Sequence, residues 1–152
     1  MEFIRLVLCA ILGYLLGNIQ TGLIIGKLNN NTDLREHGSG SSGATNALRV
    51  LGKQSAIFTL LGDFLKGMAA VGIGMLIAGQ RGGMVGAAFV VIGHIWPVFF
   101  GFHGGKGVAT SMGALLLLFP IHALIMVAAG VLVLFITKIV SLASLTGAAV
   151  FM

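Results

Sequence analysis

Long apolar runs separated by short polar segments dominate the chain. A helix needs about 20 apolar residues to cross the hydrocarbon core of a bilayer, and several runs approach that length. A charged turn, "GQRGG", separates two of the runs, and Pro120 follows another. The pattern predicts five membrane-spanning helices and the start of a sixth, at Phe3–Ile25, Ser55–Gly79, Met84–Phe100, Val108–Phe119, Ala123–Thr137 and Leu142–Met152.

Composition agrees with this pattern. Of the 152 residues, 57% are hydrophobic and only 9% are charged, whereas soluble domains carry about a quarter charged residues. We therefore expect an all-α polytopic membrane protein that forms a single integral-membrane domain over residues 1–152. Small-xxx-small patterns at Gly13/Gly17, Gly22/Gly26 and Gly82/Gly86 predict places where helices pack closely.

The basic residues in the polar segments predict an orientation, because such residues concentrate on the cytoplasmic side of a membrane. Two of them, Arg5 and Arg81, fall on one predicted side. Six fall on the other side, which we expect to be cytoplasmic: Lys27, Arg35, Arg49, Lys53, Lys106 and Lys138. The net charge of +5 is explained by this bias, so it does not indicate nucleic acid binding.

The first of two glycine-rich loops reads "GSGSSGATNALR", from Gly38 to Arg49. Small residues let consecutive backbone N–H groups surround an anion, and the arginine side chain fits a phosphate in a bidentate manner. The alternative is a flexible Gly/Ser linker. We call residues 38–49 the first loop.

The second loop reads "GFHGGKGVAT", from Gly101 to Thr110. Its glycines allow a ligand to approach the backbone, Lys106 adds a positive charge, and the loop leads into a helix N-terminus, which favours anions. Phe100 and Gly107 break the Walker A pattern, which argues against nucleotide hydrolysis. The alternative is a re-entrant turn with a lysine that reaches the interface.

Charged residues within a predicted span also require explanation, because they are costly in a bilayer. Asp63 and Lys66 are three residues apart, so they can pair on one helix face. The pair either supports function or fixes helix packing, and His94 in another span raises the same two alternatives. No pattern of Cys, His and acidic residues predicts a metal site, and we expect no cofactor.

Together these motifs resemble the bacterial acyl-phosphate:glycerol-3-phosphate acyltransferase family. The family's first motif, Ser-Gly-Asn-x-Gly-Ala-Thr-Asn-x-x-Arg, is similar to "SGSSGATNALR" at residues 39–49. Its second motif is similar to "GHIWPVF" from Gly93 and "FHGGKGVAT" from Phe102, and its Asp-x-x-Lys-Gly to "DFLKG" from Asp63. Ser41 replaces the family's asparagine, and His103 replaces a lysine.

The resemblance implies a bacterial inner-membrane enzyme whose loops face the cytoplasm. It would transfer a fatty acyl group from acyl phosphate to glycerol 3-phosphate. Its partners would be these two substrates and the membrane lipid around it. Arg49 and the second loop would bind glycerol 3-phosphate, the first loop would bind the acyl-phosphate headgroup, and Asp63, Lys66 and His94 would support them. The implied substrate-binding residues are Ser39, Gly40, Ser41, Gly43, Thr45, Asn46, Arg49, Gly104, Gly105, Lys106 and Gly107.

The motifs do not identify a catalytic base. No histidine is followed by aspartate at the spacing that other acyltransferases use, and His103 is the candidate that remains. The family has a third motif after a sixth span, so we expect a domain that is incomplete at the C-terminus and has little activity as it stands. The alternatives are an inactive fragment and a small membrane transporter or channel.

Overall fold

The computed structural model describes residues 1–29 and 31–151. All regular elements in these residues are helices, which confirms the predicted all-α class. The elements are α1 (Glu2–Gly17), α2 (Thr21–Leu28), the 3-10 helix η1 (Leu34–Glu36), α3 (Ala44–Val50), α4 (Lys53–Ile95), the 3-10 helix η2 (Val98–Phe100), α5 (Val108–Leu118), α6 (Pro120–Thr137) and α7 (Val140–Phe151).

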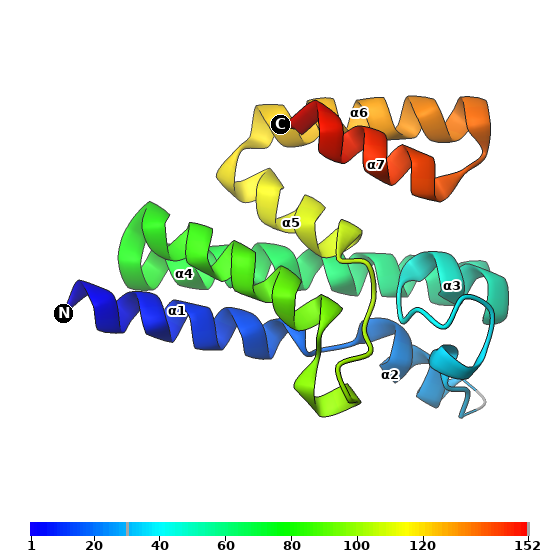
Figure 1. Ribbon diagram of the computed structural model, residues 1–152, viewed down its shortest axis with the longest axis horizontal. Coiled ribbons are helices and arrows are strands. Elements are labelled where there is room, and N and C mark those ends of the chain that lie inside the picture. Colours follow the sequence, from blue (N-terminus) through cyan, green and yellow to red (C-terminus); the bar gives the residue numbers. More distant parts are fainter. Residues whose placement is uncertain (30, 152) are drawn as a thin grey trace.

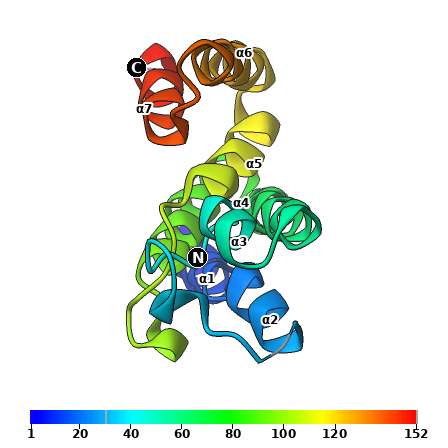
Figure 2. The ribbon, with the colours of Figure 1, turned by 90° about the vertical axis from the view of Figure 1, so that its right-hand side faces the viewer.

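The helices form layers (Figure 1). Helix α1 packs along α4, and α5 packs on another side of α4. Helices α6 and α7 form a hairpin that lies beyond α5 as a separate layer (Figure 2). The N-terminus lies at one end of the bundle, whereas α2 and α3 lie at the other end, where the two glycine-rich loops meet the helices.

Helix α4 is a hairpin of two helical arms. Ala78 and Gly79 have non-helical backbone angles, and Gly79 has a φ of 61°, which glycine adopts without steric cost. On opposite sides of this turn, Gly74 and Gly82 pack backbone against backbone with no room for a Cβ atom on either. A turn is thus confirmed between the two predicted spans, but it lies at Ala78 and Gly79, and residues 80–83 already belong to the second arm. The turn places Arg81 beside the N-terminus, where its side chain pairs with Glu2 at 2.7 Å.

Glycines also let α1 approach the second arm of α4. Gly13 lies against Gly86, and Gly17 lies against Gly93, in each case with backbone where a side chain would stand. Such contacts allow helices to pack closely in a bilayer, where apolar side chains gain little from leaving the lipid. The predicted close packing at Gly13/Gly17 and Gly82/Gly86 is confirmed.

The first predicted span, Phe3–Ile25, is not one continuous helix. The chain breaks between α1 and α2 at residues 18–20. Asn18 donates to the carbonyl O of Tyr14 at 2.8 Å, and Lys66 Nζ donates to the carbonyls of Gly17 at 3.3 Å and Ile19 at 2.6 Å. Lys66 thus supplies hydrogen bonds to two backbone carbonyls at the break, and an interrupted helix inside an apolar run needs such partners.

Within the residues that the structure describes, three helical segments are long and apolar enough to cross a membrane, by length and composition: Glu2–Leu28, Lys53–Phe100 and Pro120–Thr137. The second of these contains the α4 hairpin. Helix α5 has 11 residues and covers about 16 Å, roughly half of a hydrocarbon core. The count of five spans therefore stays a prediction, whereas the apolar helices at the predicted places are confirmed.

Candidate active site

A cavity of about 430 Å³ lies where the two glycine-rich loops meet. It is bounded by the first loop with α3, by both arms of α4, by the second loop with the start of α5, and by the turn between α6 and α7. The structure thus brings together segments that are distant in the sequence. The predicted residues that line it are Ser39, Ser41, Gly43, Thr45, Asn46, Arg49, Asp63, His94, Lys106 and Gly107.

Asn46 organises the first loop. Its side-chain Nδ2 donates to the carbonyls of Leu34, His37 and Ser41 at 2.9 to 3.0 Å, and its Oδ1 accepts from the backbone N–H of Ser39 at 2.9 Å. The side chain is buried, so its amide is committed to the loop backbone. Asn46 therefore shapes the surface that Ser39 and its neighbours present to the cavity.

The first loop rests on a small apolar core. Leu23 of α2, Leu34 of η1 and Ala47 of α3 are buried together, and Phe100 of η2 packs against them. Burial of a leucine contributes about 1.5–3 kcal/mol, enough to fix a short segment. This packing and the Asn46 hydrogen bonds indicate that the first loop has a fixed conformation. They favour a binding surface over a flexible linker, which was the alternative interpretation of the sequence.

The second loop is anchored on His94. The backbone N–H of Gly105 donates to the carbonyl O of His94 at 3.2 Å. A Cβ atom at Gly104 would overlap that carbonyl, and one at Gly105 would overlap the imidazole ring. Gly104 and Gly105 therefore have a packing reason to be glycine, and neither lines the cavity, so their contact with substrate stays a prediction.

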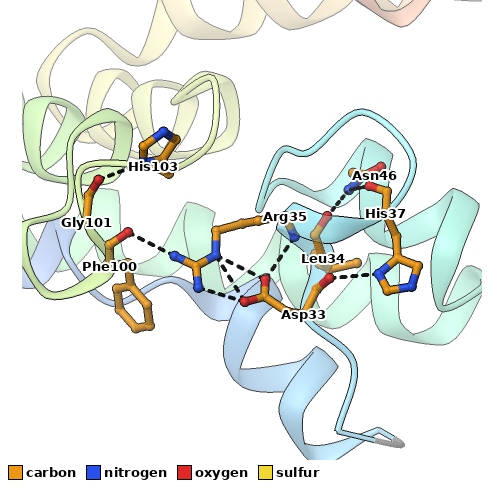
Figure 3. A network of polar contacts seen from close by, with 8 residues as sticks. All are labelled: Asp33, Leu34, Arg35, His37, Asn46, Phe100, Gly101 and His103. Carbon is orange, nitrogen blue, oxygen red and sulfur yellow. Dashed lines mark hydrogen bonds and ion pairs between the residues drawn. The ribbon is translucent and has the colours of Figure 1, made fainter.

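His103 lies outside the cavity. Its side chain is exposed, and its Nδ1 is 2.6 Å from the carbonyl O of Gly101 (Figure 3). Gly101 and Phe102 both have positive φ values, of 65° and 62°, so the chain turns sharply there. Nothing in this placement directs His103 toward the residues that line the cavity.

Gln20 connects the two glycine-rich loops through its side-chain amide. Its side-chain Oε1 accepts from the hydroxyl of Ser42 at 2.6 Å, and its Nε2 donates to the carbonyl O of His94 at 3.0 Å. That same carbonyl holds Gly105, so one buried amide connects the first loop to the anchor of the second. Sequence reasoning missed Gln20. A polar amide inside an apolar run was the available signal.

The predicted Asp63–Lys66 pair is confirmed. Oδ1 of Asp63 lies 2.9 Å from Nζ of Lys66 and 3.6 Å from Nδ1 of His94, and all three side chains are buried. Lys66 points to the α1 break and does not line the cavity, whereas Asp63 and His94 do. The pair thus has a packing role through Lys66 and borders the site through Asp63.

In the part of the chain that the structure describes, three basic side chains line the cavity: Arg49, Lys106 and Lys138. Nζ of Lys106 donates to the hydroxyl of Ser141 at 3.2 Å, so the second loop contacts the start of α7. Among the described lining residues, Asp63 is the only acid, and it is paired with Lys66. The cavity therefore presents excess positive charge suited to phosphate groups.

Sequence reasoning also missed Lys138, Ser141 and Ser144, which line the cavity from the α6–α7 turn. Ser141 and Ser144 are three residues apart on α7, so they lie on one face. Two serines at helical spacing, shortly after Lys138 and within an otherwise apolar segment, could have indicated a polar face at this position. Of the predicted residues, Gly40 also lies outside the described lining.

A family model described as glycerol-3-phosphate acyltransferase matches residues 7–152. The chain belongs to the glycerol-3-phosphate acyltransferase family. The enzyme of that name from Alkaliphilus metalliredigens is 45% identical over 139 residues, which cover 91% of this chain and 71% of the relative. The Bacillus subtilis enzyme is 47% identical over 141 residues, which cover 92% of this chain and 73% of the relative.

Solved structures agree with this glycerol-3-phosphate acyltransferase fold. A crystal structure of PlsY, an integral membrane glycerol 3-phosphate acyltransferase in its glycerol 3-phosphate form, superposes with a TM-score of 0.89 at 38% identity. The match covers 96% of this chain and 74% of PlsY. The lysophosphatidic acid form of PlsY superposes with a TM-score of 0.85. The chain is accordingly an integral membrane protein.

Proposed function

We propose that this protein transfers a fatty acyl group from acyl phosphate to glycerol 3-phosphate, giving lysophosphatidic acid and inorganic phosphate. Membership of the family supports this, as does similarity to PlsY structures described as glycerol 3-phosphate and lysophosphatidic acid forms. The observation that carries the proposal is the shared cavity, which joins both glycine-rich loops and three basic side chains.

In this reaction a hydroxyl oxygen of glycerol 3-phosphate attacks the acyl carbonyl carbon, and the bond from that carbon to the phosphate oxygen breaks. Acyl phosphate is already an activated anhydride, so no covalent acyl-enzyme is needed. The protein must hold two phosphates close together and orient the hydroxyl. We assign Arg49 and Lys106 to glycerol 3-phosphate, and Ser39, Ser41 and Thr45 of the first loop to the acyl-phosphate headgroup.

The proton of the attacking hydroxyl needs an acceptor. Asp63 is held by Lys66, and His103 lies outside the cavity, so neither is placed as an obvious base. The departing phosphate has anionic oxygens beside the reacting hydroxyl. We therefore assign proton transfer to a phosphate oxygen of the substrate, with the cavity supplying position and positive charge.

Arg49 provides a direct test of this assignment. Replacing Arg49 with lysine keeps the charge but removes the planar group that binds a phosphate through two parallel hydrogen bonds. We expect a loss of about 1–3 kcal/mol in the binding of glycerol 3-phosphate, the usual value of charge-assisted hydrogen bonds. The measurements are equilibrium binding of radiolabelled glycerol 3-phosphate and phosphate release from palmitoyl phosphate. These and the other kinetic measurements proposed for this protein use the chain extended by the C-terminal segment of a relative, because the chain spans 71–73% of the length of these relatives.

The matched control is Arg81→Lys, because Arg81 forms an exposed pair with Glu2 and is not among the residues that line the cavity. This change should leave the affinity for glycerol 3-phosphate unchanged. Equal affinities in Arg49→Lys and the unmodified protein would contradict the role of Arg49. Absence of both binding and phosphate release in the extended protein would contradict the proposed function itself.

We further propose that the cavity faces the cytoplasm at the inner membrane. The proposal is supported by the six-to-two bias of basic residues and by the place of Arg49, Lys106 and Lys138 around one cavity. Cysteines at His37 and His103, both exposed, should resist a membrane-impermeant thiol reagent added outside spheroplasts, and should react after permeabilisation.

A cysteine at Gln80, near the exposed turn of α4, is the opposite control and should react from outside without permeabilisation. The native Cys9 is buried and can be replaced by alanine to remove background. Labelling of the His37 and His103 positions from outside, with protection at Gln80, would reverse the proposed orientation.

A further inference from the structure

Arg35 lies where η1 leads into the first loop and contacts the segment that leads into the second loop. Its Nη1 donates to the carbonyl O of Phe100 at 2.9 Å, across a sequence separation of 65 residues (Figure 3). Neither Arg35 nor Phe100 lines the cavity that we assign to catalysis. Any effect of this contact on substrate must therefore pass through the loops that it connects.

Asp33 fixes the direction of Arg35. Its carboxylate accepts from Nε of Arg35 at 3.0 Å and from Nη2 at 2.7 Å, and also from the backbone N–H of Arg35 at 2.9 Å. The Arg35 side chain holds the pKa of Asp33 below its ordinary value, so the carboxylate is charged at neutral pH. Because Nε and Nη2 are both bonded to Asp33, the guanidinium group has little rotational freedom, and Nη1 stays directed at the carbonyl O of Phe100.

The first loop is tied to the same point. Asn46 donates to the carbonyls of Leu34, the first residue of η1, and of His37, which follows η1, so its contacts lie on both sides of Arg35 in the chain. Arg35 is therefore fixed relative to the first loop through Asn46, which itself lines the cavity. A displacement of η1 would be transmitted directly to the backbone around Ser39.

On the other side, Phe100 is the last residue before the second loop. Its side chain packs on the apolar core beneath the first loop, and Gly101 and Phe102 then turn the chain through left-handed conformations. Lys106 follows six residues after Phe100. Phe100 thus fixes the N-terminal end of the second loop. The hydrogen bond from Gly105 to His94 fixes the part of the loop next to Lys106.

We propose that Arg35, held by Asp33, is a positioning residue that braces the second loop against the first and so sets the place of Lys106. The inference rests on the proposed function, in which Lys106 binds glycerol 3-phosphate. A small displacement of a binding group can lower the reaction rate on the order of a hundredfold. A contact outside the cavity can therefore change the rate by changing where Lys106 lies.

The test variant is Arg35→Gln, with two readouts. Trypsin cleavage after Lys106, followed by mass spectrometry in detergent, reports release of the second loop without any substrate. We expect cleavage roughly tenfold faster, because loss of a charge-assisted hydrogen bond shifts a local opening equilibrium by about that factor. The second readout is a pair of Michaelis constants, for which we expect the KM of glycerol 3-phosphate to rise about tenfold and that of palmitoyl phosphate to stay unchanged.

Arg81→Gln is the matched control, because it removes the same charge and breaks an exposed pair at the other end of the bundle. It should change neither readout. Arg35→Lys should behave like Arg35→Gln, since one ammonium group cannot hold both Asp33 and the Phe100 carbonyl. Asp33→Asn combined with Arg35→Gln should add little to Arg35→Gln alone, because the two residues act as one unit.

The readouts separate the brace from the proposed function. Unchanged cleavage after Lys106 in Arg35→Gln would overturn the brace, whatever the kinetics. Faster cleavage with both KM values unchanged and only kcat reduced would show a purely structural contact and overturn the positioning role. If the extended protein, with no substitution, neither bound nor turned over glycerol 3-phosphate, the proposed function would fail, and the positioning role that rests on it would fail as well.

Discussion

Replacing Asp63 with leucine is expected to destabilise the folded protein by about 3–5 kcal/mol. The change leaves Lys66 buried without its 2.9 Å partner, and an uncompensated charge inside a protein is among the most costly defects. Lys66 would keep only the carbonyls of Gly17 and Ile19. Thermal unfolding in detergent can be followed through the fluorescence of Trp96, the single tryptophan in the chain.

The control for this effect is the double variant Asp63→Leu with Lys66→Met. It removes both charges, and buried ion pairs replaced by apolar groups often cost little. We expect the double variant to unfold at a higher temperature than Asp63→Leu alone. A double variant less stable than the single one would show that packing around Asp63, and not the stranded charge, decides the stability.

Replacing Lys106 with methionine is expected to lower the rate at subsaturating glycerol 3-phosphate by about a hundredfold or more. Methionine keeps most of the side-chain length but removes a positive charge from the cavity that we propose binds the phosphate groups of the substrates. Lys106 is the lysine of the second loop that lines the cavity, and its contact with Ser141 holds it toward α7. Phosphate release from palmitoyl phosphate measures the effect.

Lys53→Met supplies the matched control. Lys53 is exposed at the start of α4, on the same predicted side of the membrane, and is not among the residues that line the cavity. Both variants lose one positive charge, so a general electrostatic effect would lower both rates equally. Equal rates in the two variants would show that Lys106 does not bind substrate.

Several features followed from the sequence because their causes are local. Hydrophobic runs predicted apolar helices, and Gly79 allowed the turn within α4. Asp63 and Lys66 pair because a helix places residues three apart on one face. The two glycine-rich loops were predicted to bind anions on one side of the membrane, from their residue types and their similarity to family motifs, and residues of both loops line one cavity.

The connections around that cavity were decided only by the tertiary structure. Gln20 bonds to His94 across 74 residues, Arg35 to Phe100 across 65, and Lys106 to Ser141 across 35. Local pattern reports which face of a helix is apolar, but not which distant carbonyl meets a given side chain. Such partners are set by how glycine-lined helices approach each other, because a buried polar group must find its hydrogen bond wherever packing brings it.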